Sequence, residues 1–93
     1  MAKKYYEIGL MKQASAAEHD YETIDWEDDY DNVADARKQA KKLSKQCPFT
    51  HYGGCEVVAV QITCHSDEED ISSYYLHWSE TYVGGKMVRR IDY

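Results

Sequence analysis

The sequence is poor in the features that export, membrane insertion and disulfide bonding require. Its 93 residues include one proline, one phenylalanine and three cysteines. Basic residues near the amino terminus are followed by no apolar run, so we expect neither a signal peptide nor a transit peptide. No stretch approaches the roughly 20 apolar residues that cross a bilayer. Together with the odd cysteine number, these absences predict a cytoplasmic protein with free thiols and no membrane contact.

Catalytic motifs are also missing. The chain has no glycine-rich phosphate loop, nucleophile elbow or metalloprotease helix. Cys64 and His65 are adjacent, so on a strand their side chains would point to opposite faces. Glu80 and Asp92 could approach across a hairpin, but carboxylates on a small sheet more often neighbour Lys or Arg. Because so short a chain forms only a thin core, we predict no enzyme activity and no cofactor.

Residues 31–47 have the pattern of an amphipathic helix. The apolar face would consist of Val33, Ala36, Ala40, Leu43 and Cys47. Between them lie the basic residues that would face water, Arg37, Lys38, Lys41, Lys42 and Lys45. Asp29 or Asp31 could cap the amino end, and Pro48 would end the helix just beyond its last apolar position.

Alternating side chains predict strands at 3–12, 55–65, 73–82 and 86–93. Residues 18–26 fit a further strand less clearly, residues 66–70 form an acidic loop, and Gly84-Gly85 gives the last hairpin turn. The core-facing strand residues would include Tyr6, Ile8, Leu10, Val58, Val60, Ile62 and Cys64. The predicted fold is α+β, one domain over residues 1–93 in ββαβββ order. One helix would pack on one face of an antiparallel sheet of four to five strands.

Charge is segregated along the chain. The segment from Glu18 to Asp35 has nine carboxylates and no Lys or Arg, within a net charge of −6. Alternate carboxylates on an extended chain lie roughly 6.5–7 Å apart and can imitate a row of DNA phosphates, with aromatic residues between them as anchors. The predicted partner-binding residues are Asp20, Glu22, Asp25, Trp26, Glu27, Asp28, Asp29, Tyr30 and Asp31. The alternative is a solvated acidic edge that only keeps the domain soluble.

Two further kinds of site stay open. A zinc ion would draw its ligands from Cys47, His51, Cys55 and Cys64. Their spacing is looser than that of zinc knuckles, and thiols packed in the core account for the cysteines more simply. A homodimer would bury the sheet face opposite the helix, which would carry Tyr5, Tyr75 and His77.

In its size, acidic charge and strand–helix–strand layout, the chain resembles small phage-encoded inhibitors, in particular anti-CRISPR proteins. The resemblance rests on these overall properties and on no signature motif, so it assigns no functional residue. It implies an inhibitor acting in the host cytoplasm on a protein partner with a basic groove for nucleic acid. The net negative charge argues against direct binding to nucleic acid or to an anionic membrane.

Overall fold

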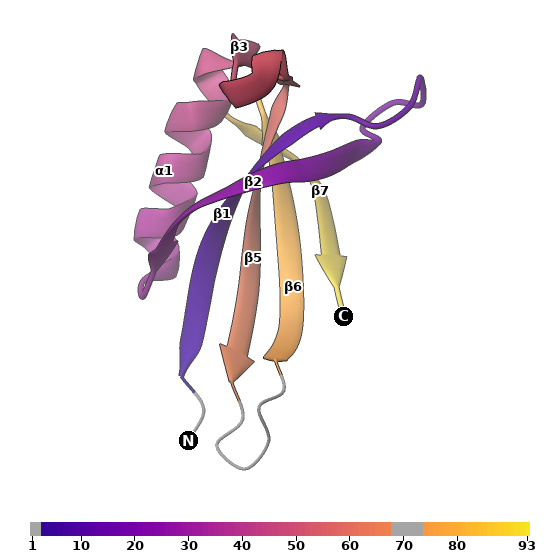
Figure 1. Cartoon of the computed structure of the whole chain (residues 1–93). Coiled ribbons are helices and arrows are strands. Elements are labelled where there is room, and N and C mark those ends of the chain that lie inside the picture. The colour runs from indigo at the N-terminus through magenta and orange to yellow at the C-terminus, as the bar shows by residue number, and fades with distance from the viewer. Residues whose placement is uncertain (1–2, 68–73) are drawn as a thin grey trace.

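The structure is a computed structural model that describes residues 3–67 and 74–93. In these residues, one α-helix packs on one face of an antiparallel sheet (Figure 1). The elements are β1 (Lys4–Gln13), β2 (Tyr21–Tyr30), α1 (Val33–Gln46), β3 (Phe49–Thr50), η1 (Tyr52–Gly54), β4 (Glu56–Val57), β5 (Ala59–Asp67), β6 (Tyr74–Val83) and β7 (Lys86–Asp92). The five-stranded sheet has the order β2-β1-β5-β6-β7, and a small sheet pairs β3 with β4. The predicted α+β fold is confirmed.

The predicted acidic loop at 66–70 was wrong at its start, because residues 66 and 67 belong to β5; residues 68–70 and Ser73 lie outside the described residues. No helix within the described ranges has the length and apolar character needed to cross a membrane. Gly84 and Gly85 form the predicted turn between β6 and β7, both with positive φ, at 61° and 84°.

The core lies between α1 and the central strands. Ile8 and Leu10 of β1 and Ile62 of β5 are at most 1% exposed, which confirms the predicted inner face of these strands. They meet Ala36 and Ala40, both fully buried, whose short side chains let the helix approach the sheet closely. Burying each large aliphatic side chain contributes roughly 1.5–3 kcal/mol.

The predicted strand at 55–65 is broken at Val58, so β4 and β5 are separate strands. Val57 pairs with Phe49 of β3 and is fully buried, as is Ala59, whereas Val58 is half-buried. The predicted alternation is therefore wrong before Ala59 and correct after it. The break allows the Val58 amide to donate to the Met11 carbonyl at 2.9 Å, an interaction that the sequence pattern does not reveal.

The amino-terminal cap of α1 is neither predicted aspartate but Asn32, which follows Asp31 directly and lies three residues after Asp29. Asn32 has extended dihedral angles, and its side-chain oxygen accepts from the amides of Ala34 at 2.8 Å and Asp35 at 3.3 Å. Asp29 belongs to β2 and Asp31 precedes the cap, so neither occupies the position from which a side chain reaches the first free amides. At the other end the helix stops before Pro48, as predicted.

Arg37 was predicted to face water, but it is half-buried and contacts the sheet. Its guanidinium donates to both carboxylate oxygens of Glu80 on β6, at 3.0 and 2.9 Å, and lies 5.4 Å from the Trp78 ring centroid. The residue follows the buried Ala36 on the helix, so its side chain reaches the sheet at the margin of the apolar stripe.

Candidate functional site

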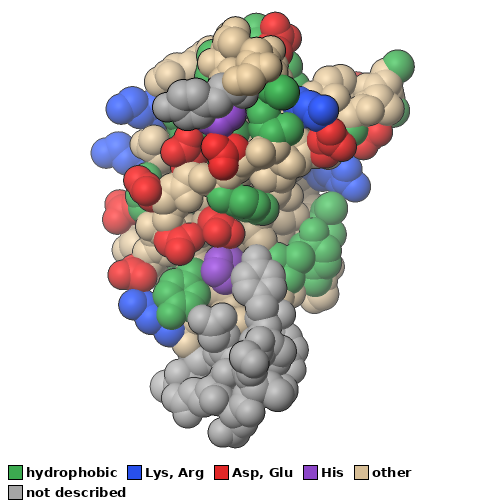
Figure 2. All heavy atoms as spheres, viewed as in Figure 1, with side chains coloured by type: hydrophobic (Ala, Val, Ile, Leu, Met, Phe, Trp, Pro, Cys, Tyr) green, Lys and Arg blue, Asp and Glu red, His purple; other side chains and the backbone are tan. Residues whose placement is uncertain are grey.

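The predicted acidic surface lies along β2, an edge strand of the five-stranded sheet. β2 is longer than predicted and includes the acidic residues that we expected to form a connection to the helix. Figure 2 shows acidic side chains gathered over this part of the molecule. Seven of the nine predicted site residues are on β2, while Asp20 lies in the turn before it and Asp31 follows it.

Two of the carboxylates form ion pairs with lysines from another segment of the chain, so the local sequence does not reveal them. Glu22 pairs with Lys12 of β1 at 3.0 Å, and Asp31 pairs with Lys3 at 3.2 Å. Both lysines come from the neighbouring β1 segment, which runs antiparallel to β2. The segment is therefore less uniformly negative than its composition indicates. Such exposed pairs contribute little to stability, but they reduce the charge available to a partner.

Asp25 is held by a residue from the segment that follows the helix. His51 Nε2 lies 2.8 Å from its Oδ2, and the Trp26 amide donates to its Oδ1 at 2.9 Å. The hydrogen bonds from His51 and from the Trp26 backbone lower the pKa of Asp25. The contact between Asp25 and His51 therefore joins β2 to the residue that directly precedes η1.

The proposed zinc ligands are not brought together. Cys64 is fully buried in the sheet, while Cys47 and Cys55 are half-buried at other places in the fold. Burial raises the pKa of the thiols of Cys47 and Cys64. Within residues 3–67 and 74–93, these cysteines and His51 do not form a group with converging ligand atoms. The three cysteines have the properties of packed thiols.

A β-bulge exposes the middle of the acidic strand. Glu7 pairs with Asp29 and Gly9 pairs with Trp26, so Glu27 and Asp28 together oppose a single residue of β1. A bulge on an edge strand turns side chains out of the regular alternation. In the described part of the chain, the side chains of Glu27 and Asp28 form no ion pair or hydrogen bond, and both residues are exposed.

The two aromatic residues of the predicted site have different surroundings. Trp26 is 44% exposed, and its ring lies over Gly9, where an added Cβ would come within 2.8 Å of the ring. Glycine at this position therefore allows the indole to lie against the sheet. Tyr30 instead packs against the hydrophobic core and is half-buried. Burial, followed by the charge of Asp28, raises the pKa of Tyr30.

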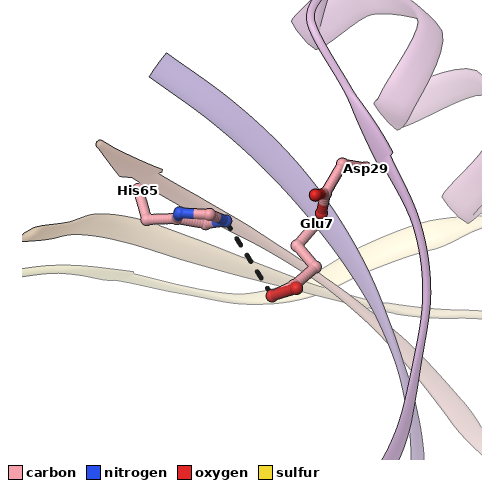
Figure 3. A group of neighbouring side chains, drawn as sticks. All are labelled: Glu7, Asp29 and His65. Carbon is pink, nitrogen blue, oxygen red and sulfur yellow. Dashed lines mark ion pairs between the residues drawn. The ribbon is translucent and has the colours of Figure 1, made fainter. Parts of the chain in front are cut away.

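A second cluster, which the sequence did not reveal, joins Glu7 of β1, Asp29 of β2 and His65 of β5 (Figure 3). One potential ligand atom from each residue lies within 4.8 Å of the others, and His65 Nε2 is 3.8 Å from a Glu7 oxygen. Alternation placed Glu7 and His65 on the sheet face away from the helix. Asp29 was expected in a connection, so its place beside them could not be predicted.

The fold and these sites define a small α+β protein with an acidic, bulged edge strand. The surface over the described residues has no pocket. Comparisons with family models, with curated proteins and with solved structures give no match. The functional argument therefore depends on the residues themselves.

Proposed function

We propose that the protein is a non-enzymatic binding protein that inhibits a nucleic-acid-binding protein, such as a CRISPR effector, by occupying its basic groove. The observation that carries the proposal is the bulge of β2, where the exposed residues Glu27 and Asp28 directly follow the exposed Trp26 in the chain. A partner would therefore contact an aromatic anchor and two carboxylates that have no basic partner among the described residues, all on one edge strand.

The geometry of β2 supports mimicry of a nucleic-acid backbone. Its side chains are spaced by an extended chain, and the strand has a neighbour in the sheet on one side alone. A net charge of −6 would speed association with a basic groove through electrostatic steering. Salt should then slow association and weaken binding.

The contacts rank the nine predicted residues. Glu27, Asp28 and Trp26 form the centre of the proposed surface because they are exposed and make no competing polar side-chain contact in the described part of the chain. Glu22 and Asp31 contribute less because Lys12 and Lys3 partly neutralise them. The remaining four residues make other side-chain contacts, so we place them at the periphery of the proposed surface: Asp20, Asp25, Asp29 and Tyr30.

A homodimeric interaction module is the alternative that we carry forward. The motivating surface is the sheet face away from the helix, where Tyr5 is half-buried and Trp26 exposed. The side chain of Tyr75, named for this face from the sequence, lies outside the described residues. His77 is within hydrogen-bond distance of the Ser66 hydroxyl, at 2.8 Å. Sedimentation at several protein concentrations would detect this dimer.

The test is inhibition of DNA binding by a panel of purified CRISPR effector complexes, measured by electrophoretic mobility shift at several salt concentrations. We expect the protein to inhibit at least one member at near-stoichiometric amounts. The double variant E27Q/D28N should lose inhibition by roughly tenfold or more, since central charged contacts are worth more than rim contacts.

The matched control is E18Q/E56Q, which removes the same charge from exposed residues outside β2. It should inhibit within about twofold of the unchanged protein, because loss of net charge alone acts weakly at moderate salt. Equal inhibition by the unchanged protein and E27Q/D28N would exclude the acidic β2 surface. If no member of the panel is inhibited, this partner class is wrong.

A further inference from the structure

The cluster of Glu7, Asp29 and His65 crosses three adjacent strands on the sheet face away from the helix. Glu7 and Asp29 are direct partners in the β1–β2 pairing. His65 pairs with Tyr5, two residues before Glu7, so it lies diagonally from Glu7 on the same face. Figure 3 shows the three side chains converging, with an imidazole nitrogen directed at the Glu7 carboxylate.

The donor set has the chemistry of a metal site. It offers one imidazole nitrogen and two carboxylates, ligands that zinc and other divalent transition metals accept. Around zinc, ligand bonds of roughly 2.1 Å place tetrahedral ligand atoms roughly 3.4 Å apart. The observed 3.8 Å between His65 Nε2 and the Glu7 oxygen is close to that spacing, and small side-chain rotations would bring in the third ligand.

The local charge also favours a cation. Glu7 and Asp29 make no ion pair with Lys or Arg within residues 3–67 and 74–93. Two adjacent carboxylates repel each other, and a bound metal ion would relieve that repulsion. His65 is 8% exposed and borders the pair on the sheet, so it limits the movement of one ligand.

We propose that Glu7, Asp29 and His65 form a zinc-binding site. The inference does not depend on the proposed inhibitor function. Asp29 is exposed, so a fourth position would open to water, as in zinc sites that are not fully enclosed by protein. The proposed site is separate from Cys47, His51 and Cys55, and its ligands are nitrogen and oxygen atoms alone.

The test is isothermal titration of the metal-free full-length protein with zinc chloride, in parallel with magnesium chloride. We expect one zinc ion per chain and no comparable magnesium binding, because imidazole is a poor ligand for magnesium. Glu7→Gln and Asp29→Asn should each weaken zinc binding by at least tenfold. His65→Asn should do the same, and since His65 is buried, circular dichroism must show that this variant folds.

Two controls separate the proposed site from other zinc ligands. The variants C47S/C55S and D25N/H51N should each bind zinc within about twofold of the unchanged protein. Substituted cobalt should give no thiolate-to-metal charge-transfer absorption. The proposal is overturned if zinc does not bind, if Glu7→Gln binds zinc unchanged, or if the cysteine variant loses binding. Failure of inhibition by E27Q/D28N would not affect these results, because neither residue is a proposed ligand.

Discussion

At the scale of single residues, Glu80 is a buried carboxylate held by three side chains. Its side chain is 3% exposed, and it accepts hydrogen bonds from Arg37, Arg90 and the Tyr82 hydroxyl. Both guanidinium groups also lie against the Trp78 ring, at 5.4 and 4.6 Å from its centroid. Burial raises the pKa of Glu80, but the hydrogen bonds outweigh burial, so its pKa is lowered overall. Burial and the bond to Glu80 raise the pKa of Tyr82 to about 12.

We expect Glu80→Gln to lower the free energy of unfolding by about 2 kcal/mol, measured by urea denaturation at pH 7. The substitution keeps the shape but removes the charge that two arginines share. The cost stays below that of a fully buried pair because both arginines retain contact with water. The control is Asp92→Asn, a 70%-exposed partner of Arg90, which should cost no more than about 0.5 kcal/mol. Equal costs for the two variants would contradict this account.

At the scale of elements, α1 is fixed at both ends by specific hydrogen bonds. Asn32 caps the amino end. Near the carboxyl end, the Gly85 amide donates to the Ser44 hydroxyl at 2.8 Å and the Gly84 amide donates to the Ser44 carbonyl at 3.2 Å. Ser44 is fully buried although it is polar, because these contacts join the helix to the β6–β7 turn. The sequence predicted the helix and the turn but not the bond between them.

The cap gives a direct test of the corrected helix start. Asn32→Ala should destabilise the protein by about 1 kcal/mol, since two amides lose their acceptor. Asp31→Ala should cost only a few tenths of a kcal/mol, because its ion pair with Lys3 is exposed. Thermal or urea unfolding of both variants would compare them, and a larger loss for Asp31→Ala would restore the original prediction.

At the scale of the whole molecule, two buried or half-buried carboxylates give opposite dependence on pH. Glu80 has a lowered pKa in the folded protein, so its stabilisation is present above its unfolded pKa and is lost as pH falls. Glu7 has a raised pKa, so its stabilisation is present at low pH and is lost as pH rises through the folded value. Asp29 of β2 and His65 of β5 are the charged or titratable neighbours that act on Glu7.

The raised pKa of Glu7 gives a prediction for the Glu7→Gln variant, with a chelator present in all samples. As pH rises from 4 to 7, the free energy of unfolding of the variant should increase relative to that of the unchanged protein. Near pH 4 both proteins have a neutral side chain at this position, so the difference should be small. At pH 7 the variant avoids the partial burial of a charged carboxylate and its repulsion from Asp29, and urea unfolding should show the greater stability. Glu56→Gln, at an exposed site outside the cluster, should show no such trend. A difference that does not change with pH would contradict the coupling.

Much of the fold was predictable because it depends on local periodicity. The spacing from Val33 to Cys47, the alternation around Ile62 and the Gly84-Gly85 turn each determine a local structure through one short segment. The strand break at Val58 was not predictable, because both alternations of this apolar run look alike. The extension of β2 was also missed, since acidic residues rarely favour strands and pairing with β1 overrides that preference.

The sequence by itself determined the α+β class, the order of the main helix and the long strands, and the concentration of carboxylates before the helix, but not the small β3–β4 sheet. Only the tertiary structure decided which of those carboxylates remain without a partner, because Lys3, Lys12 and His51 approach from other segments. Likewise, strand pairing alone brings Glu7, Asp29 and His65 together. Local patterns set what each segment forms, whereas charge neutralisation and ligand geometry depend on contacts between residues that are distant in the chain.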